Sequence, residues 1–267
     1  MSDLITKSEQ SLIRQSFSAR ERHEPLNGDG FGIGWYMPEI DSSPCVFRDV
    51  RPAWANENLR RLAEKIRSGA MFAHVRAASR DTAVSEANCH PFQVGEFLWM
   101  HNGKIANFDR IKRRLREGLS DQYYGCVQGT TDSEHAFALF MDILSPHSRS
   151  YSAQSLVDAM QETVAQLKKL TDEEGAESPS YLNFSLTDGR HTIVTRHVTR
   201  ADADAPSLYY ASGAAFEAVD GRYHMQPAID GPESYIIASE PLTSDRDEWA
   251  SVPANHMVVL DPELKFQ

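Results

Sequence analysis

Polar side chains that could bind an amide substrate stand directly after apolar segments of this sequence. Arg76 follows the apolar run Met71–Val75 and is flanked by small residues. An arginine at the end of a strand suits bidentate capture of a carboxylate. For this arginine taken alone, an ordinary surface ion pair is the simpler explanation.

A second candidate lies where the apolar run Phe97–Met100 ends in His101-Asn102-Gly103. Asn102 offers a side-chain amide and Gly103 a backbone N–H, and both kinds of donor serve in oxyanion holes. Asn-Gly is also a common hairpin turn, which is the simpler explanation in isolation. The oxyanion interpretation therefore depends on the other polar positions.

Asp132 is the third candidate, at the start of a predicted helix, where the helix dipole favours a carboxylate. It could cap the helix or face the ammonium group of a substrate. The segment Cys89-His90-Pro91 could hold a reactive pair, although a structural turn explains it more simply. Together, Arg76, Asp132 and the Asn102–Gly103 pair describe a site for an α-amino acid that carries a side-chain amide.

Short strands are expected to hold two of these positions. The runs Met71–Val75 and Phe97–Met100 are apolar and bounded by turn residues, as buried strands are. The stretch Asn27–Tyr36 contains four glycines within seven residues and then Ile33, Trp35 and Tyr36. This pattern predicts a turn that leads into a strand packed closely on a neighbour.

Helices are predicted from apolar residues spaced three and four apart. Thr131 and Glu134 have the spacing of a capping box at the start of one of them. The arginine-rich helix after Asn107 is most simply solvated on its charged face. The predicted helices are Asn56–Arg67, Phe108–Gly118, a helix from Thr131 that stops at Pro146, and Ser152–Leu170.

From Ser180 onwards the pattern turns to strands, with a hairpin signal at Asp188-Gly189. Further strands are predicted at Leu208–Ala211, Tyr235–Ala238 and Met257–Leu260. Strands on both sides of two long central helices predict an α+β architecture of antiparallel sheets layered with helices. Without a clear boundary in the sequence, we expect a single domain over residues 1–267.

The composition limits the classes of function. Twenty-seven basic and 38 acidic residues give a net charge of −11, which argues against non-specific binding to nucleic acid or to an anionic membrane. Cys45, Cys89 and Cys126 lack paired spacing, which favours a reducing compartment. Neither a signal sequence nor a membrane-length apolar run is found. We expect a cytoplasmic protein that binds a small molecule without a metal or cofactor.

Taken in order, the polar segments resemble the class II glutamine amidotransferases. The branch they resemble has a single stand-alone amidotransferase-like domain without a fused synthase, and includes γ-glutamyl hydrolases of glutathione breakdown and ergothioneine formation. The resemblance covers about residues 2 to 260. Its segments are Asn27–Trp35, His74–Ser79, Asn88–Phe92, His101–Gly103, Thr131–Glu134 and Ala238–Leu242.

The resemblance implies the four-layer αββα sandwich of N-terminal-nucleophile hydrolases, with two mainly antiparallel sheets between helices. It also implies roles: Arg76 would bind the α-carboxylate of glutamine, and Asp132 its α-ammonium. Asn102 Nδ2 and the Gly103 N–H would bind the oxyanion. Ser79 stands where the family often has a substrate-contacting threonine.

The family's nucleophile is a cysteine directly after the initiator methionine, whose own α-amine is the general base. This chain begins Met1-Ser2. Our preferred interpretation is that a first segment with the cysteine is absent from this chain. The alternatives are a natural pseudoenzyme that binds γ-glutamyl ligands or regulates a partner, and replacement of the nucleophile by Ser2 or Cys89. On the first two interpretations, we expect the chain as written to be inactive towards glutamine.

Two other classes of function remain as lower-ranked alternatives. A zinc hydrolase could use His74, His90, His101 and Cys89, although their spacings are not those of common zinc motifs. A pure interaction module would bind a protein partner, which the sequence does not identify, and would not bind γ-glutamyl compounds.

Overall fold

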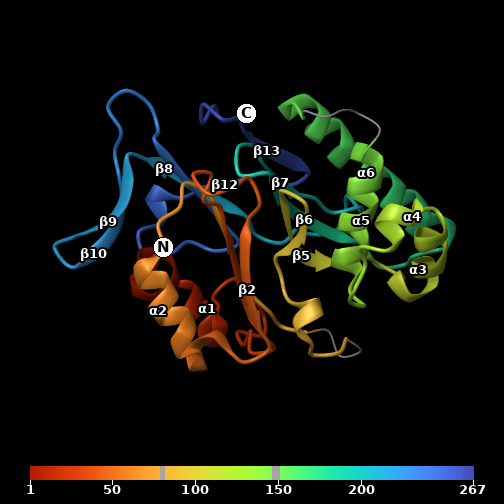
Figure 1. The fold of residues 1–267 in the computed structure, drawn as a ribbon, viewed down its shortest axis with the longest axis horizontal. Helices are drawn as coiled ribbons and strands as arrows, with labels where there is room; N and C mark the ends of the chain where they lie inside the picture. Colours follow the sequence, from red (N-terminus) through yellow and green to blue (C-terminus); the bar gives the residue numbers. More distant parts are fainter. Residues whose placement is uncertain (79–81, 146–150) are drawn as a thin grey trace. The chain divides into compact units, whose positions relative to one another are not determined.

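The computed structural model describes residues 1–78, 82–145 and 151–267. The chain separates into two compact units (Figure 1). The first comprises Met1–Pro91 and Ser207–Pro253, and the second comprises Phe92–Pro206 and Ala254–Gln267. The single domain expected over residues 1–267 stays a prediction.

The second unit is built on a five-stranded antiparallel sheet with the strand order β13-β7-β6-β5-β4. In its centre, β5 pairs with β6 so that Asn102 stands opposite Asn183 and Gly103 opposite Leu182. The predicted strand Phe97–Met100 is confirmed and extends through Asn102 and Gly103 to Lys104. The bounds are β4 Phe92–Val94, β5 Phe97–Lys104, β6 Tyr181–Thr187, β7 Thr192–Arg196 and β13 His256–Leu260.

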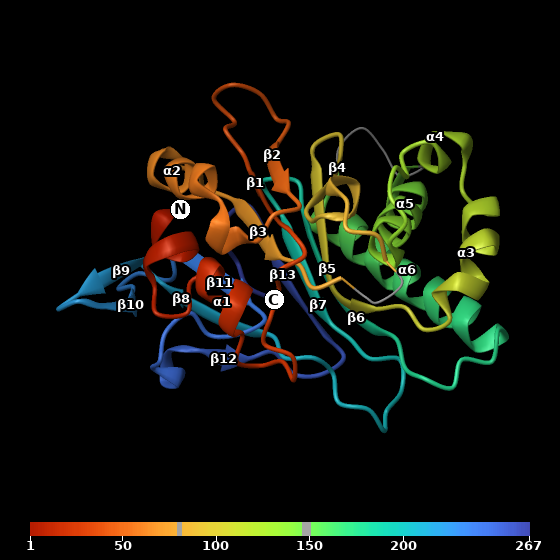
Figure 2. The same cartoon turned by 90° about the horizontal axis from the view of Figure 1, so that it is seen from below.

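Helices cover one face of this sheet (Figure 2). Trp99 of β5 is fully buried and stacks on Phe137 of α5, with ring centroids 5.4 Å apart. Aromatic and aliphatic side chains of both layers form one core, so burial fixes α5 against β5. The helices are α3 Phe108–Glu117, α4 Asp121–Tyr124, α5 Asp132–Leu144 and α6 Ala153–Glu173.

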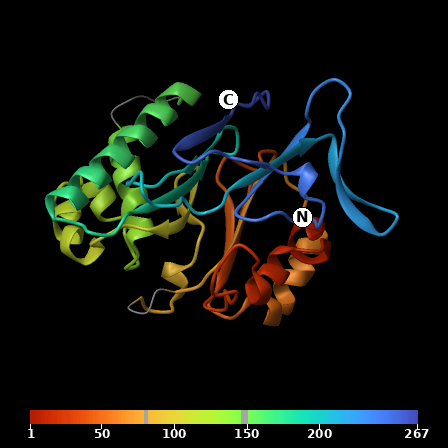
Figure 3. The same cartoon turned by 180° about the vertical axis from the view of Figure 1, so that it is seen from behind.

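The first unit contains two three-stranded sheets and a separate hairpin, all antiparallel. Their strand orders are β2-β1-β3 and β11-β8-β12, and the hairpin pairs β10 with β9 (Figure 3). The bounds are β1 Phe31–Trp35, β2 Cys45–Asp49, β3 Met71–Val75, β8 Tyr209–Gly213, β9 Ala215–Val219, β10 Arg222–Gln226, β11 Ser234–Ala238 and β12 Ala250–Ser251.

The glycine-rich strand is β1, and it is buried along its whole length. A side chain at Gly32 would place its Cβ only 2.1 Å from the carbonyl oxygen of His90. The expected close approach of a neighbour is therefore confirmed, and it explains why this position needs a residue without a side chain.

Helices of the first unit begin with a short π-helix, Asp3–Lys7, followed by α1 Leu12–Ser18. The predicted helix Asn56–Arg67 is confirmed as α2 Glu57–Lys65, which Asn56 caps by accepting a hydrogen bond from the Leu59 N–H at 2.8 Å. Short 3-10 helices occupy Ala53–Ala55, Glu86–Asn88 and Arg246–Glu248. None of the described helices is long and apolar enough to cross a membrane.

Candidate functional site

The two predicted oxyanion donors lie at the exposed end of β5, whereas the start of this strand is buried. Asn102 is exposed, and within the described residues its side chain makes no hydrogen bond. Leu182, opposite Gly103, donates its N–H to His197 O rather than to β5. The alternation of an antiparallel ladder therefore directs the Gly103 N–H away from β6.

Gly103 is held in a conformation that favours glycine. Its φ is +154°, and a Cβ added there would lie 2.0 Å from the carbonyl oxygen of Tyr181 on β6. Real side chains do not tolerate such a distance. The backbone can therefore take this path past Tyr181 only because residue 103 lacks a side chain.

Asp132 lies at the first position of α5, half-buried. Its Oδ2 accepts a hydrogen bond from the Ile105 N–H at 2.7 Å, and its Oδ1 accepts one from the Ser133 N–H at 2.8 Å. Since Ile105 follows β5 directly, the structure brings Asp132 together with the strand end that carries Asn102 and Gly103.

The cap of α5 is Thr131, not Asp132. The Thr131 hydroxyl accepts a hydrogen bond from the Glu134 N–H at 3.2 Å. The Glu134 carboxylate accepts hydrogen bonds from the N–H groups of Gln128 and Gly129, at 2.9 and 2.7 Å. The cap predicted for Thr131 is therefore confirmed, and the Asp132 side chain is not needed to cap the start of the helix.

Arg76 belongs to the first unit, directly after β3, and only 5% of it is exposed. Its guanidinium donates to two backbone carbonyl oxygens, Asp29 O at 3.4 Å and Ala83 O at 3.3 Å. Among the described residues it forms no ion pair. The surface ion pair, which is the simplest explanation from the sequence, is therefore wrong, because this cation is buried and its partners among the described residues are backbone carbonyls.

The backbone fixes Arg76 tightly. Its N–H donates to Gly30 O at 2.8 Å, and its carbonyl oxygen accepts from the Asp29 N–H at 2.9 Å. The Asp29 carboxylate accepts from the Ala78 N–H at 2.8 Å. Ser79, the remaining predicted substrate contact, lies outside the described residues. That Arg76 and Asp132 face one ligand stays a prediction.

Cys89 is a poor candidate for a substitute nucleophile. Its thiol is fully buried and lies 3.5 Å from Ser85 O and 3.7 Å from Asp49 O. Burial raises the pKa of this thiol, which opposes formation of the reactive thiolate despite the nearby Arg76. Ser2 is also buried, at the start of the π-helix.

The residues of the zinc alternative do not form a metal-binding group. His101 has both ring nitrogens engaged, by Ser133 and by the carbonyl of Tyr181. Within the described ranges, the one set of potential metal ligands that meets in space is His224, Asp245 and Glu248. Its His224 Nδ1 and Glu248 Oε1 lie 2.7 Å apart as an ion pair or hydrogen bond.

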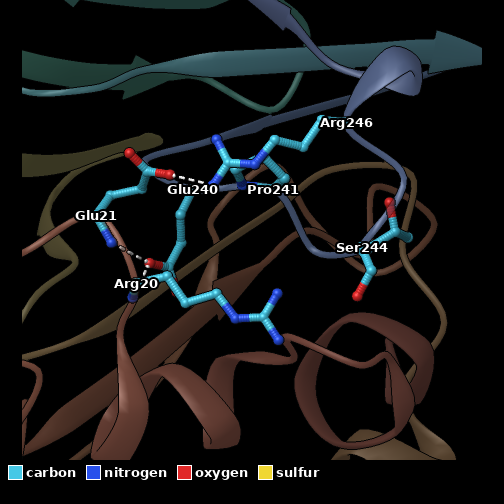
Figure 4. A pocket seen from close by; sticks show the side chains of 7 residues that line it. Arg20, Glu21, Glu240, Pro241, Ser244 and Arg246 are labelled. Atoms are coloured by element: carbon cyan, nitrogen blue, oxygen red, sulfur yellow. Dashed lines mark hydrogen bonds and ion pairs between the residues drawn. The ribbon is translucent and has the colours of Figure 1, made fainter.

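A polar pocket in the first unit contains Glu240 of the segment Ala238–Leu242 (Figure 4). The buried Glu240 carboxylate accepts from the N–H groups of Arg20 and Glu21, at 2.6 and 3.0 Å, and from Gln10 Nε2 at 2.8 Å. This segment is part of the sequence resemblance, which assigned it no role. The contacts show that Glu240 holds the loop after α1 in place through hydrogen bonds to its backbone. The pocket is lined by Arg20, Glu21, Glu240, Pro241, Thr243, Ser244 and Arg246.

Comparison with known proteins identifies the family. The model of the class-II glutamine amidotransferases matches residues 3–263. A probable glutamine amidotransferase of Saccharomyces cerevisiae, DUG3, is 39% identical over 97% of this chain and 78% of its own length. A γ-glutamyl-hercynylcysteine sulfoxide hydrolase of Mycolicibacterium smegmatis is 24% identical over 97% of this chain and 89% of its own.

A solved structure of a protein from this family has a similar fold. The class-II glutamine aminotransferase domain protein of Silicibacter pomeroyi aligns with a TM-score of 0.63 and 26% identity, over 89% of this chain and 90% of that one. The α+β fold of the N-terminal-nucleophile type, implied by the sequence resemblance, is thereby confirmed.

Proposed function

The chain belongs to the class-II glutamine amidotransferases, and from this membership we propose that its site binds the α-amino acid end of glutamine or of another γ-glutamyl compound. In this proposal Arg76 binds the α-carboxylate, Asp132 binds the α-ammonium, and Asn102 Nδ2 with the Gly103 N–H binds the oxygen of the γ-amide. Ser79 would assist in substrate contact.

The buried guanidinium of Arg76, which pairs with no acidic side chain among the described residues, is the observation that carries the proposal. Burying a cation without a counter-ion costs several kcal/mol of free energy. A carboxylate paired with the cation would offset a cost of this size. Two backbone carbonyls compensate it in part. A ligand carboxylate that accepts two parallel N–H bonds would supply the counter-ion that the described residues do not.

The second unit supplies what the other end of such a ligand needs. The Asp132 carboxylate is half-buried at a helix start, and each of its oxygens accepts one backbone N–H. Oδ2 keeps a free lone pair to which an ammonium group can donate, while Oδ1 also lies 3.3 Å from the Ser133 hydroxyl. The nearby Asn102 amide is exposed and unengaged by the described residues, so it is available to a carbonyl oxygen.

We further propose that the 267-residue polypeptide binds such ligands without hydrolysing them. Burial of the Cys89 thiol opposes its use as a nucleophile, and Ser2 is buried as well. The γ-glutamyl hydrolase relative supports a γ-glutamyl compound, beside glutamine, as ligand class.

Isothermal calorimetry with L-glutamate tests this function. Glutarate, which lacks the ammonium group, and L-aspartate, which is one methylene shorter, serve as comparison ligands. We expect L-glutamate to bind, and both comparison ligands to bind at least tenfold more weakly. Equal affinity for L-glutamate and glutarate would refute the role proposed for Asp132. If L-glutamate did not bind at all, the proposed function would be refuted.

Substitutions separate the two charged groups. Arg76→Met should weaken L-glutamate binding at least 30-fold, because two charge-assisted hydrogen bonds are worth about 2–3 kcal/mol or more. Arg51→Met is the matched control, since Arg51 is exposed and already paired with Asp49. Asp132→Asn should weaken L-glutamate binding and leave glutarate binding nearly unchanged.

A further inference from the structure

His101 is a buried histidine that joins two parts of the second unit through its ring nitrogens. Nε2 lies 2.8 Å from the carbonyl oxygen of Tyr181, and Nδ1 lies 2.9 Å from Ser133 Oγ. A carbonyl oxygen only accepts, so Nε2 carries the proton and Nδ1 accepts the hydrogen bond of the Ser133 hydroxyl. Burial lowers the pKa of His101, in keeping with a neutral ring.

The hydrogen bond of His101 Nε2 affects the oxyanion donors through the carbonyl of Tyr181. The carbonyl of Tyr181 that His101 holds is the same one that lies 2.0 Å from the position of a Gly103 Cβ. His101 thus keeps the Tyr181 carbonyl against the backbone of Gly103. If this hydrogen bond were lost, the carbonyl could move and the direction of the Gly103 N–H would no longer be fixed.

The Nδ1 contact reaches the ammonium-binding carboxylate. Ser133 follows Asp132, and its N–H donates to Asp132 Oδ1 at 2.8 Å. The Ser133 hydroxyl lies 2.9 Å from His101 Nδ1 and 3.3 Å from Asp132 Oδ1. Having one proton, it donates to the nearer nitrogen, which leaves Asp132 Oδ1 able to accept from a ligand.

We propose that His101 is the positioning residue of this site, whose Nε2–H tautomer sets the spacing between the Asp132 carboxylate and the Gly103 N–H. The proposal rests on the proposed function. His101 does not touch the ligand: its ring packs on Phe184, with centroids 4.7 Å apart, and residues 101 and 102 of a strand point to opposite faces. It acts through Ser133 and Tyr181.

Two conservative substitutions separate its contacts. In His101→Asn, the amide oxygen takes the place of Nδ1 and keeps the Ser133 contact, but cannot reach Tyr181. In His101→Gln, the amide nitrogen takes the place of Nε2 and loses the Ser133 contact. We expect His101→Asn to weaken both L-glutamate and glutarate five- to 30-fold, because the oxyanion donor moves for either ligand.

Ser133→Ala gives a readout that general loss of structure would not give. It should weaken L-glutamate five- to 20-fold and leave glutarate within twofold, because only the Asp132 side is disturbed. Ser133→Ala combined with His101→Gln should be no weaker than His101→Gln alone. The matched control is Ser155→Ala, which removes a serine from the first turn of α6 instead of α5.

Nitrogen-15 NMR of histidine-labelled protein tests the tautomer directly, without a ligand. Protonation at Nε2 and not at Nδ1 is expected for His101, and the opposite tautomer overturns the inference even if the variants fail to fold. Where the unchanged chain binds L-glutamate but Ser133→Ala and both His101 variants bind it equally well, the positioning role is wrong and the proposed function stands. Absence of binding by the unchanged chain overturns both.

Discussion

The Asp132 carboxylate accepts a hydrogen bond from the backbone N–H of Ile105 at 2.7 Å. This contact joins the first residue of α5 to the residue that follows β5. The Asp132 carboxylate and the proposed oxyanion donors Asn102 and Gly103, which lie about thirty residues apart in sequence, thereby become neighbours. The substrate-binding hypothesis for the second unit depends on this one hydrogen bond more than on any property of Asp132 alone.

Replacement of Gly103 should be costly for stability. Gly103→Ala forces a Cβ to within 2.0 Å of Tyr181 O, so we expect the free energy of unfolding in urea to fall by about 2–4 kcal/mol. Gly95→Ala is the control, because Gly95 also has a positive φ, +56°, but nothing within 4 Å of the added Cβ. It should cost only about 1 kcal/mol. Equal losses would refute the steric argument.

We expect Arg76 to be required for ligand binding but not for the stability of the fold. Arg76→Met removes a buried cation that no described acidic residue pairs with. We expect the free energy of unfolding without ligand to stay the same or to rise by up to about 2 kcal/mol. Thermal unfolding monitored by circular dichroism measures this. A loss above about 2 kcal/mol would mean that an internal partner stabilises the guanidinium.

Acid should destabilise the second unit through His135. Its Nδ1 donates to Thr131 O at 2.7 Å, and its buried Nε2 has no partner among the described residues. Burial lowers the pKa of His135 to about 4. As the pH falls below about 6.5, the unfolded chain therefore takes up a proton that the folded chain refuses, and stability decreases until about pH 4.

The size of this effect follows from the shift in pKa. About 3 kcal/mol of stability should be lost between pH 6.5 and pH 4 on account of His135, since one pKa unit corresponds to about 1.36 kcal/mol. His135→Gln, which does not titrate, should flatten the dependence of the unfolding free energy on pH by this amount. Denaturant unfolding at several pH values measures it, and parallel curves for both proteins would contradict the assignment.

We expect no turnover of glutamine by the polypeptide. The purified 267-residue polypeptide should release no more ammonia from glutamine than its Asn102→Ala variant, because Ser2 is buried and burial opposes attack by the Cys89 thiol. A coupled glutamate dehydrogenase assay measures the ammonia. Release that exceeds the Asn102→Ala background would show that another group attacks the amide, and Ser2→Ala and Cys89→Ala variants would then identify it.

Most of the individual elements were predictable from the sequence because they depend on local patterns. Apolar spacing placed α2, α3, α5 and α6 to within a few residues, and Asp188-Gly189 marked the turn between β6 and β7, where Gly189 has a φ of +84°. The strands β2, β4, β9, β10 and β12 were missed. Of these, β4 and β12 have only three and two residues, and β2, β9 and β10 are largely exposed or half-exposed, so they lack the apolar alternation that identifies a strand.

The order of the polar segments by itself determined the family, and with it the candidate roles of Arg76, Asn102, Gly103 and Asp132. Only the tertiary structure decided that Arg76 is buried, with no counter-ion among the described residues, and that Asp132 accepts a hydrogen bond from the Ile105 N–H. It also decided that His101 joins Ser133 to Tyr181. These contacts link segments that are distant in the chain, and the hydrogen-bonding needs of buried polar groups, which create them, leave no periodic pattern in a sequence.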